Sequence, residues 1–208
     1  MKNAIALIVV AGLAAAASAQ DFEISVVAPN EVAPGATYTV EFWGSVSGAP
    51  WVQGTSAMSG FGIDAVASAG AAGVGGVANQ VIASWASGFG TAGTIQGANI
   101  VGTSGGQLAN LFGFLNPNIN MSNPILLFSF DVTVANGFFG TITYSAANPN
   151  VNGGLSFYPV STDGASIIAP NDSGTTLTLL SASTRIIPAP ASLALLGLGG
   201  MVAGRRRR

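Results

Sequence analysis

The side chains that could carry out chemistry are few and of restricted types. The 208-residue chain contains no histidine and no cysteine, and its only lysine is Lys2. A serine nucleophile needs a neighbouring base, so the familiar triad is excluded, and so is a Ser–Lys dyad once the first residues have been removed. Disulfides and thiolate sites are excluded as well. Carboxylates, amides, hydroxyls and indoles remain.

Three carboxylates in the middle of the chain, Glu41, Asp64 and Asp131, could serve a glycosidase. That reaction needs one acid and one base or nucleophile on either side of the glycosidic bond. Carboxylates scattered over a surface explain the same residues equally well. We therefore predict that the protein is not an enzyme, and a carboxylate-dependent glycosidase is the third and weakest hypothesis.

Two polar turns in the last quarter of the chain could bring oxygen ligands together. Asp163 lies in the turn 163–164 and Asp172 in the turn 171–174. Carboxylate and amide oxygens are the ligands that calcium prefers, but the spacing of an EF-hand loop is missing. The same residue types form ordinary Asx-turns. The sequence favours turns without a cofactor, with Ca²⁺ as the alternative.

The three tryptophans could stack on sugar rings. Trp43 falls on the polar side of an expected strand and Trp51 lies in the loop that follows, so both are candidates for glycan contact. An indole more often belongs to a core or lies beneath a second sheet. Packing is therefore favoured for all three, and most strongly for Trp85.

A glycine-rich segment superficially matches a dinucleotide-binding fingerprint. Gly73, Gly75 and Ala78 have the required spacing. No acidic residue follows about twenty positions later to bind a ribose. We interpret the segment as a flexible glycine loop.

The N-terminal segment has the three parts of a secretory signal peptide. Lys2 precedes an apolar run over 4–17, and residues 17–19 read Ala17-Ser18-Ala19, a small-x-small site. Signal peptidase would cut between Ala19 and Gln20. The apolar run is shorter than the roughly 20 residues that span a bilayer, which argues against an uncleaved anchor. Residues 1–19 are therefore predicted to be a cleaved signal helix.

The C-terminal segment combines a proline motif, an apolar helix and a basic end. It consists of Pro188, Ala189 and Pro190, then the apolar residues 191–204, then Arg205, Arg206, Arg207 and Arg208. A helix from Pro190 to Gly204 would be about 22 Å long, against a hydrocarbon core of ~30 Å. The arginines should stay on the cytoplasmic side, which leaves the preceding domain outside.

This order of features resembles the PEP-CTERM sorting domain, with Ala189 in place of the usual glutamate. The resemblance covers residues 188–208 and implies processing by an exosortase-type enzyme in bacteria that make extracellular polysaccharide. It implies export, transient anchoring in the inner membrane through 191–204, and delivery to the cell surface or extracellular matrix. A permanent anchor is the alternative, but it does not explain the Pro-Ala-Pro motif.

The domain left after processing, residues 20–187, is acidic. It has one basic residue, Arg185, against eight Asp and Glu, so its net charge is −7. Nucleic acid is therefore not expected as a partner. Between Asp64 and Asp131 lie 66 residues without a formal charge, which could be long loops, a partner surface or partly disordered material.

Apolar and polar residues alternate with a period of two through the domain, and turn residues interrupt the pattern at short intervals. The clearest strand begins at Thr37. A second has Leu126, Phe128 and Phe130 on its apolar face. Strands are predicted over 22–27, 37–46, 60–67, 80–87, 94–101, 126–134, 138–145, 155–160 and 175–186.

Connections between these strands indicate the fold class. Asn136-Gly137 predicts a tight hairpin between 126–134 and 138–145. A helical turn is expected over 107–115. About eight to ten short strands without a long amphipathic helix predict an all-β fold, a single antiparallel β-sandwich of jelly-roll-like type.

The order of elements also resembles cohesin-like and carbohydrate-binding sandwich modules. The shared features are a turn at 32–35 that leads into a long strand, the stretch Gly-Phe-Gly-Ile-Asp at 60–64, and the strand at 127–132. This resemblance implies a sandwich fold and transfers no functional residue.

Three functions are consistent with the sequence. The main hypothesis is an exported, non-enzymatic protein of the cell surface or of an extracellular polysaccharide matrix, sorted at its C-terminus. The second is an adhesin that binds a glycan or another partner through its strand faces and neutral loops. The third is the glycosidase.

Overall fold

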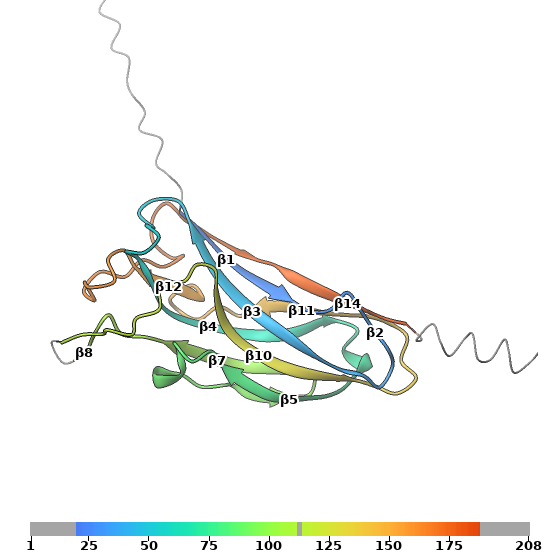
Figure 1. The fold of residues 1–208 in the computed structure, drawn as a ribbon. Helices are drawn as coiled ribbons and strands as arrows, with labels where there is room; N and C mark the ends of the chain where they lie inside the picture. Colours follow the sequence, from blue (N-terminus) through green and yellow to red (C-terminus); the bar gives the residue numbers. More distant parts are fainter. Residues whose placement is uncertain (1–19, 112–113, 188–208) are drawn as a thin grey trace, which may run out of the picture.

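Alternating apolar residues produce strands throughout residues 20–111 and 114–187, the parts of the chain that the computed structural model describes. The strands form two sheets packed face to face (Figure 1), so the predicted all-β sandwich is confirmed. The predicted signal helix (1–19) and C-terminal hydrophobic helix (within 188–208) lie outside the described residues. No helix within the described ranges is long and apolar enough to cross a membrane.

The first sheet, called sheet A here, has the strand order β13-β1-β3-β10-β5. Three of its four pairings are antiparallel, and β13 at the edge runs parallel to β1. The bounds are β1 Gln20–Val27, β3 Thr37–Ser47, β5 Val74–Ile82, β10 Ile125–Val134 and β13 Thr175–Leu179.

The second sheet, sheet B, has the order β2-β14-β11-β4-β7-β6, and β12 pairs with the first half of β4. Strands β14 and β2 pair in parallel. The bounds are β2 Glu31–Val32, β4 Ala57–Ala69, β6 Thr94–Gln96, β7 Asn99–Gly106, β11 Gly140–Ala147, β12 Leu155–Tyr158 and β14 Ser181–Ile186.

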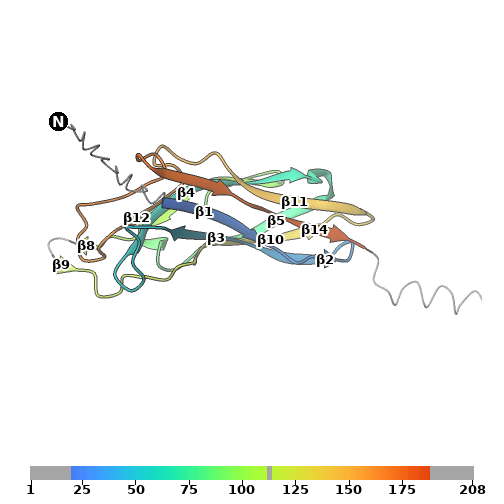
Figure 2. The same cartoon turned by 90° about the horizontal axis from the view of Figure 1, so that it is seen from above.

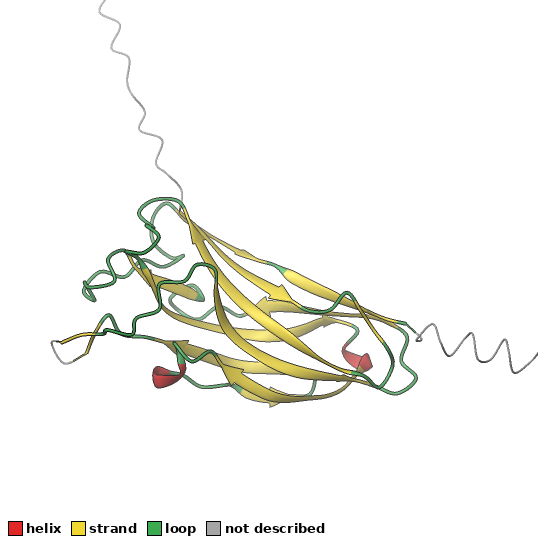
Figure 3. Cartoon of the chain, in the orientation of Figure 1, coloured by secondary structure: helices red, strands yellow, loops and turns green. Residues whose placement is uncertain are grey.

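Smaller elements lie outside the two sheets. Strands β8 (Asn110–Leu111) and β9 (Phe114–Leu115) pair with each other, and η1 (Ala71–Gly73) and η2 (Ser87–Phe89) are single turns of 3-10 helix. These two turns are the only helical segments drawn in Figure 3 for the described residues. The helical turn predicted over 107–115 is therefore wrong, since its described residues include β8 and β9.

Aromatic rings join the two sheets in the core. Phe42 stacks on Phe128 of the same sheet at 4.5 Å between ring centroids, and Phe61 of sheet B stacks on Phe128 at 6.0 Å. Phe130 meets Tyr144 of sheet B edge-on at 5.2 Å. Such pairs contribute about 0.5–1.5 kcal/mol each beyond the burial of their area. The rings therefore fix how the two sheets face each other.

The turn at Asn136-Gly137 does not form the predicted hairpin. Strand β10 pairs with β3 and β5 in sheet A, whereas β11 pairs with β4 and β14 in sheet B. The turn therefore carries the chain from one sheet to the other. A local turn signal encodes a reversal of direction, but the sheet in which the next strand pairs depends on partners far away in sequence.

A β-bulge changes which residues of β10 face the core. The register between β10 and β3 shifts between Leu126 and Phe128. As a result Ile125 and Leu127 are buried together with Phe128, whereas Leu126 is half-buried. A one-residue slip moves the following side chains to the opposite face of a sheet. The prediction that Leu126 shares the apolar face of Phe128 is wrong for this reason.

Three further local predictions are corrected by the strand pairing. The flexible glycine loop expected at 73–78 is mostly strand β5, held against β10, and the strand expected over 80–87 ends at Ile82. The strand expected over 94–101 is a hairpin of β6 and β7 that turns at Gly97, whose φ is 63°. Such a turn suits glycine because it has no Cβ to clash.

The last predicted strand, 175–186, is two strands. It breaks at Leu180, so that β13 belongs to sheet A and β14 to sheet B. The amide of Leu180 donates to the carbonyl of Ile24. The chain thus changes sheets while it stays extended, and a continuous alternating pattern cannot reveal such a change.

The two ends of the sandwich differ in their connections (Figures 1 and 2). At one end, called the turn end, the connections are the segments 33–36, 70–73 and 135–139. At the other, the loop end, lie 48–56, 83–90, 107–111, 114–124 and 159–174. The described chain starts at the loop end, with Gln20, and finishes at the turn end, after β14.

Candidate binding groove

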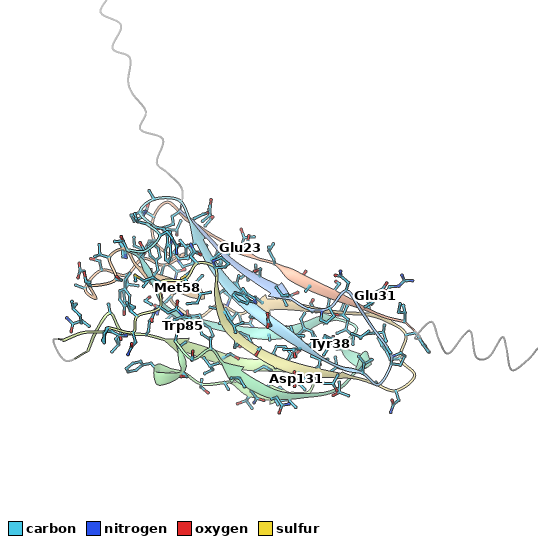
Figure 4. The ribbon with its side chains drawn as sticks, viewed as in Figure 1. Glu23, Glu31, Tyr38, Met58, Trp85 and Asp131 are labelled. Carbon is cyan, nitrogen blue, oxygen red and sulfur yellow. The ribbon has the colours of Figure 1, made fainter. Side chains whose placement is uncertain are left out.

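A groove opens at the loop end, where β7 finishes. It consists of a cavity of about 790 Å³ and an adjoining one of about 250 Å³, which share Phe89, Gly106, Gln107 and Leu108. We call the two cavities together the loop-end groove. Figure 4 shows Trp85 at this end of the molecule, far from Glu31 and Tyr38.

The larger cavity combines apolar and uncharged polar side chains. The apolar ones are Trp85, Phe89, Leu108, Leu115 and Pro117. Phe89 and Leu115 are 60% and 57% exposed. Amides and hydroxyls of Ser84, Ser87, Gln107, Asn116 and Asn118 complete the lining. Exposed apolar side chains gathered in a cavity with a few polar groups are typical of a binding site.

Trp85 lines the groove with a fixed orientation. It follows β5, and its indole N–H donates to the carbonyl of Leu126 at 2.6 Å. Its ring packs against Phe61 of sheet B at 6.1 Å between centroids. The indole is half-buried, so part of this ring is held in the core and part faces the cavity.

Phe89 is presented at the boundary between the two cavities. It is the last residue of η2, and the next residue, Gly90, approaches β7 so closely that a Cβ there would fall on the carbonyl oxygen of Ser104. Thr91 and Ser104 exchange backbone hydrogen bonds at 2.9 and 3.0 Å. The turn is therefore held against the sheet while its aromatic ring remains exposed.

Gln107 forms the floor that both cavities share. Its side-chain Nε2 donates to the carbonyls of Met58 and Asn120, both at 2.8 Å, and its Oε1 accepts from the amide of Asn120 at 2.8 Å. Its backbone amide donates to the carbonyl of Ser59 at 2.9 Å. Gln107 is 5% exposed, so it positions the surrounding loops rather than projecting toward a ligand.

The segment 115–118 is closed by another amide. Asn116 Nδ2 donates to the carbonyl of Leu108 at 3.0 Å, and its Oδ1 accepts from the amide of Asn118 at 3.0 Å. The amide of Asn116 donates to the carbonyl of Ala109. These bonds hold in place the segment that brings Leu115 and the exposed Asn118 to the lining of the larger cavity.

The groove is electrically neutral. None of the described residues that line either cavity is Asp, Glu, Lys or Arg. Tyr158 lines the smaller cavity and donates to the carbonyl of Gln107 at 3.2 Å. Burial raises the pKa of Tyr158 above its ordinary value of 10.0, so it stays uncharged at physiological pH. An uncharged ligand fits this lining, because an ion would lose part of its hydration without gaining a partner of opposite charge.

The three carboxylates considered for a glycosidase are separated between the sheets. Asp64 lies in sheet B and is 8% exposed, and its two oxygens accept from the amide of Gly102 and from Asn148 Nδ2, both at 2.7 Å. It lies where the register of β4 with β7 shifts, between Ile63 and Ala65. Asp64 therefore holds a bulge together.

Glu41 and Asp131 lie on the outer face of sheet A. Glu41 Oε2 accepts from the indole of Trp43 at 3.0 Å. Asp131 accepts from Asn79 Nδ2 at 2.9 Å and from Thr39 Oγ1 at 2.8 Å. The bonds from Asn79 and Thr39 hold the pKa of Asp131 below its ordinary value. A lowered pKa opposes the role of general acid.

The two tryptophans considered as candidates for glycan contact do not line the groove. Trp43 is half-buried on the outer face of sheet A, where its indole N–H is bonded to Glu41. Trp51 packs against Phe157 of the core at 5.2 Å between ring centroids. Its Nε1 is buried without a hydrogen-bond partner.

The polar turns considered for calcium use their oxygens within the turns. Asp163 Oδ1 accepts from the amide of Ala165 at 3.0 Å, and Asp172 Oδ2 accepts from the amide of Ala169 at 2.8 Å. The first bond, to the amide two residues further on, is that of an Asx-turn, whereas Asp172 bonds back to the amide three residues before it. No three His, Cys, Asp or Glu side chains of the described residues gather as metal ligands.

Sequence reasoning missed the residues that make the groove. It assigned Trp85 to the core and did not single out Phe89 or Leu115. The available signal was the neutral stretch between Asp64 and Asp131, because every residue of the larger cavity comes from it. The sorting residues 188–190 and 205–208 and the signal-cleavage residues 17 and 19 lie outside the described residues.

Comparisons with known proteins include a likeness in structure to a solved chain. No family model and no curated protein matches the sequence. A cohesin module from a family 33 glycoside hydrolase of Clostridium perfringens ATCC13124 is similar in structure, with a TM-score of 0.41 and 9% sequence identity. The match covers 83% of this chain and 99% of that one.

Proposed function

We propose that the protein is an exported, non-enzymatic binding module of the cell surface or extracellular matrix, and that the loop-end groove binds an uncharged polysaccharide chain. The observation that carries this proposal is a neutral groove that presents Phe89, an exposed aromatic ring, beside the fixed indole of Trp85.

A sugar ring suits this lining for chemical reasons. It has an apolar face of C–H groups, which packs on an aromatic ring, and an edge of hydroxyls, which both donate and accept hydrogen bonds. Amide and hydroxyl side chains such as Asn118 and Ser87 can do the same without a charge. The larger cavity, about 790 Å³, lies within the usual range of ligand sites, about 300–1,000 Å³.

Delivery to the outside is the second part of the proposal. Cleavage by signal peptidase before Gln20 and processing after Pro188-Ala189-Pro190 by an exosortase-type enzyme would release a domain of net charge −7. The apolar residues 191–204 and the arginines 205–208 would hold the chain in the inner membrane until then.

Intact-mass measurement of the protein recovered from cells and from medium tests the delivery step. Loss of the segment after the Pro-Ala-Pro motif supports sorting. A mature product that retains Arg205–Arg208 contradicts sorting and favours the permanent anchor.

Two phenylalanines of equal exposure provide the test of the groove. Phe89 is 60% exposed at the groove, and Phe139 is 59% exposed at the turn end. Binding of the mature protein to soluble neutral glucans and mannans is measured by isothermal calorimetry. Phe89→Ala should weaken binding about tenfold or more, equivalent to about 1.4 kcal/mol, whereas Phe139→Ala should leave it unchanged.

Other results of the same measurement decide between the hypotheses. Equal losses in both variants would show that the groove is not the site. Binding of an uncharged polypeptide in place of the glycans would favour a protein partner. New reducing ends in the glycan sample would revive the glycosidase. Affinity should also be insensitive to salt, because the lining has no charge to screen.

A further inference from the structure

The loop-end groove continues beyond the two cavities described above. A third cavity, of about 90 Å³, adjoins the cavity of about 250 Å³ and shares Gly60, Asn152 and Ser156 with it. Among the described residues, none lines both this third cavity and the one of about 790 Å³. The three cavities therefore follow one another in order of decreasing size. We call the smallest one the narrow pocket.

Three neighbouring strands of sheet B form the floor beneath the middle cavity and the narrow pocket. Gly60 of β4 pairs with Gly106 of β7 on one side and with Ser156 of β12 on the other. Neighbouring strands lie about 4.8 Å apart, so this row of three residues is about 10 Å across. A Cβ at Gly106 would lie 2.6 Å from the carbonyl oxygen of Ser59. Two of the three floor positions thus have no side chain, which keeps a path open across the strands.

The volumes decide what each cavity can hold. A cavity of about 150 Å³ holds one benzene ring. The middle cavity, at about 250 Å³, is large enough for one six-membered sugar ring, and the largest, at about 790 Å³, for more than one. The narrow pocket, at about 90 Å³, is too small for a ring. It fits a short group that projects from the ring in the middle cavity.

The polar side chains of the narrow pocket are two amides and a hydroxyl, from Asn150, Asn152 and Ser156. Asn150 Oδ1 accepts from the backbone amides of Asn152 at 3.1 Å and of Gly154 at 3.2 Å. The backbone amide of Asn150 donates to the carbonyl of Gly62 on β4 at 2.9 Å. These bonds hold the segment 150–154 against sheet B, so the pocket is preformed and uncharged.

We propose that the narrow pocket binds the hydroxymethyl group of a hexose unit, so that the groove selects polymers of hexoses over polymers of pentoses. This inference rests on the proposed binding of a neutral polysaccharide in the loop-end groove. A hydroxymethyl group is short and uncharged, and its hydroxyl both donates and accepts. The side chains of Asn152 and Ser156 can bond it in either direction. A xylose unit has only hydrogen at this position, so it leaves both side chains without that partner.

Two hexasaccharides that differ only in this group test the proposal on the mature protein. Cellohexaose consists of β-1,4-linked glucose units, and xylohexaose consists of β-1,4-linked xylose units, which lack the hydroxymethyl group. Isothermal calorimetry should give an affinity for cellohexaose that is higher by about tenfold or more. Equal affinities, or tighter binding of xylohexaose, would overturn the proposal, and so would a failure of cellohexaose to bind.

Two exposed asparagines in different parts of the groove provide a matched pair of variants. Asn152 borders the narrow pocket, whereas Asn118 lines the largest cavity. Asn152→Ala should reduce the preference for cellohexaose about threefold or more, as expected for the loss of one hydrogen bond. Asn118→Ala should weaken binding of both hexasaccharides by the same factor. An unchanged preference in Asn152→Ala contradicts the role of the narrow pocket.

Phe89→Ala separates this inference from the proposed function. If this variant binds both hexasaccharides more weakly while the parent protein does not distinguish them, the groove binds glycans and only the hydroxymethyl pocket is refuted. If the variant binds both as tightly as the parent does, the groove is not the site. The proposed function then fails together with this inference.

Discussion

The two ends of the sandwich are made from the same strands but are held in different ways. At the turn end the connections are short, and at one of them the backbone leaves no room: a Cβ at Gly70, whose φ is 71°, would fall on the carbonyl oxygen of Thr141. At the loop end, side-chain amides hold long segments of chain in place. The protein therefore closes its fold at one end and leaves a groove open at the other.

Asn123 is a good example of an amide that replaces a strand neighbour. Its Oδ1 accepts from the amide of Val46 at 3.1 Å, and its Nδ2 donates to the carbonyl of Val46 at 2.7 Å. This is the pattern of donor and acceptor that a paired strand would offer. Together with Gln107 and Asn116 it holds the segment 115–124 without a charged side chain.

The largest difference in stability is expected between two glycine substitutions, one at each end. Gly70→Ala should lower the free energy of unfolding by about 3 kcal/mol or more, through backbone strain and a clash with a carbonyl. Gly88→Ala, at the loop end, should change it by less than about 0.5 kcal/mol, because nothing lies within 4 Å of the added Cβ. Urea denaturation measures both free energies of unfolding. Similar losses would contradict the difference in packing between the turn at Gly70 and the turn at Gly88.

Removal of the buried amide should produce the next largest effect. Gln107→Ala deletes three side-chain hydrogen bonds and leaves the backbone groups of Asn120 without these partners, for a loss of about 2 kcal/mol. Faster hydrogen exchange at the Asn120 amide should accompany it. Asn136→Ala, an exposed amide of the turn end, is the control, and an equal loss there would count against the role of amides at the loop end.

The indoles of the loop end give a smaller contrast. Trp85→Phe removes a donor to the carbonyl of Leu126 and should cost about 1 kcal/mol, while the remaining ring should retain most of the glycan affinity. Trp51→Phe removes an N–H that has no partner, so its loss of stability should be smaller. Thermal unfolding of both variants checks the order, and the reverse order would contradict it.

The smallest effect is expected between the two ends, on the outer face of sheet A. Hydrogen bonds from Asn79 and Thr39 lower the pKa of Asp131. Because the folded pKa is the lower one, this carboxylate stabilises the protein above pH ~4, and the contribution disappears as the pH falls through the folded pKa. Asp131→Asn should make the free energy of unfolding fall less steeply below pH 4. The difference should be less than about 1 kcal/mol, since solvent screens the site.

Local patterns were enough to predict the sandwich but not its connections. Tyr38, Val40 and Phe42 are buried as their alternation predicts, because burial of one face needs only a period of two. The Asn136-Gly137 turn predicts a hairpin between the strands on its two sides, but these strands belong to different sheets. The end of β10 is held instead by a residue far away in sequence, because the amide of Val134 donates to the carbonyl of Ala36.

The groove was less predictable than the strands. The sequence indicates that the neutral stretch between Asp64 and Asp131 could be a partner surface, long loops or disordered material. It does not predict that Phe89 is exposed, because the cavity beside it forms only where the end of β7 meets the segment 115–118. Trp85 looked like a core residue and is one in part, since one contact is with Phe61. The terminal signals remain predictions from motif order.

The parallel pairs that close the sandwich have a kinetic consequence. Strand β1 needs β13 and β2 needs β14, and the hydrogen bond from Thr176 to Asp21 spans 155 positions of sequence. Contacts of such high contact order slow folding. A chain synthesised from its N-terminus therefore keeps β1 and β2 without these partners until its last strands arrive.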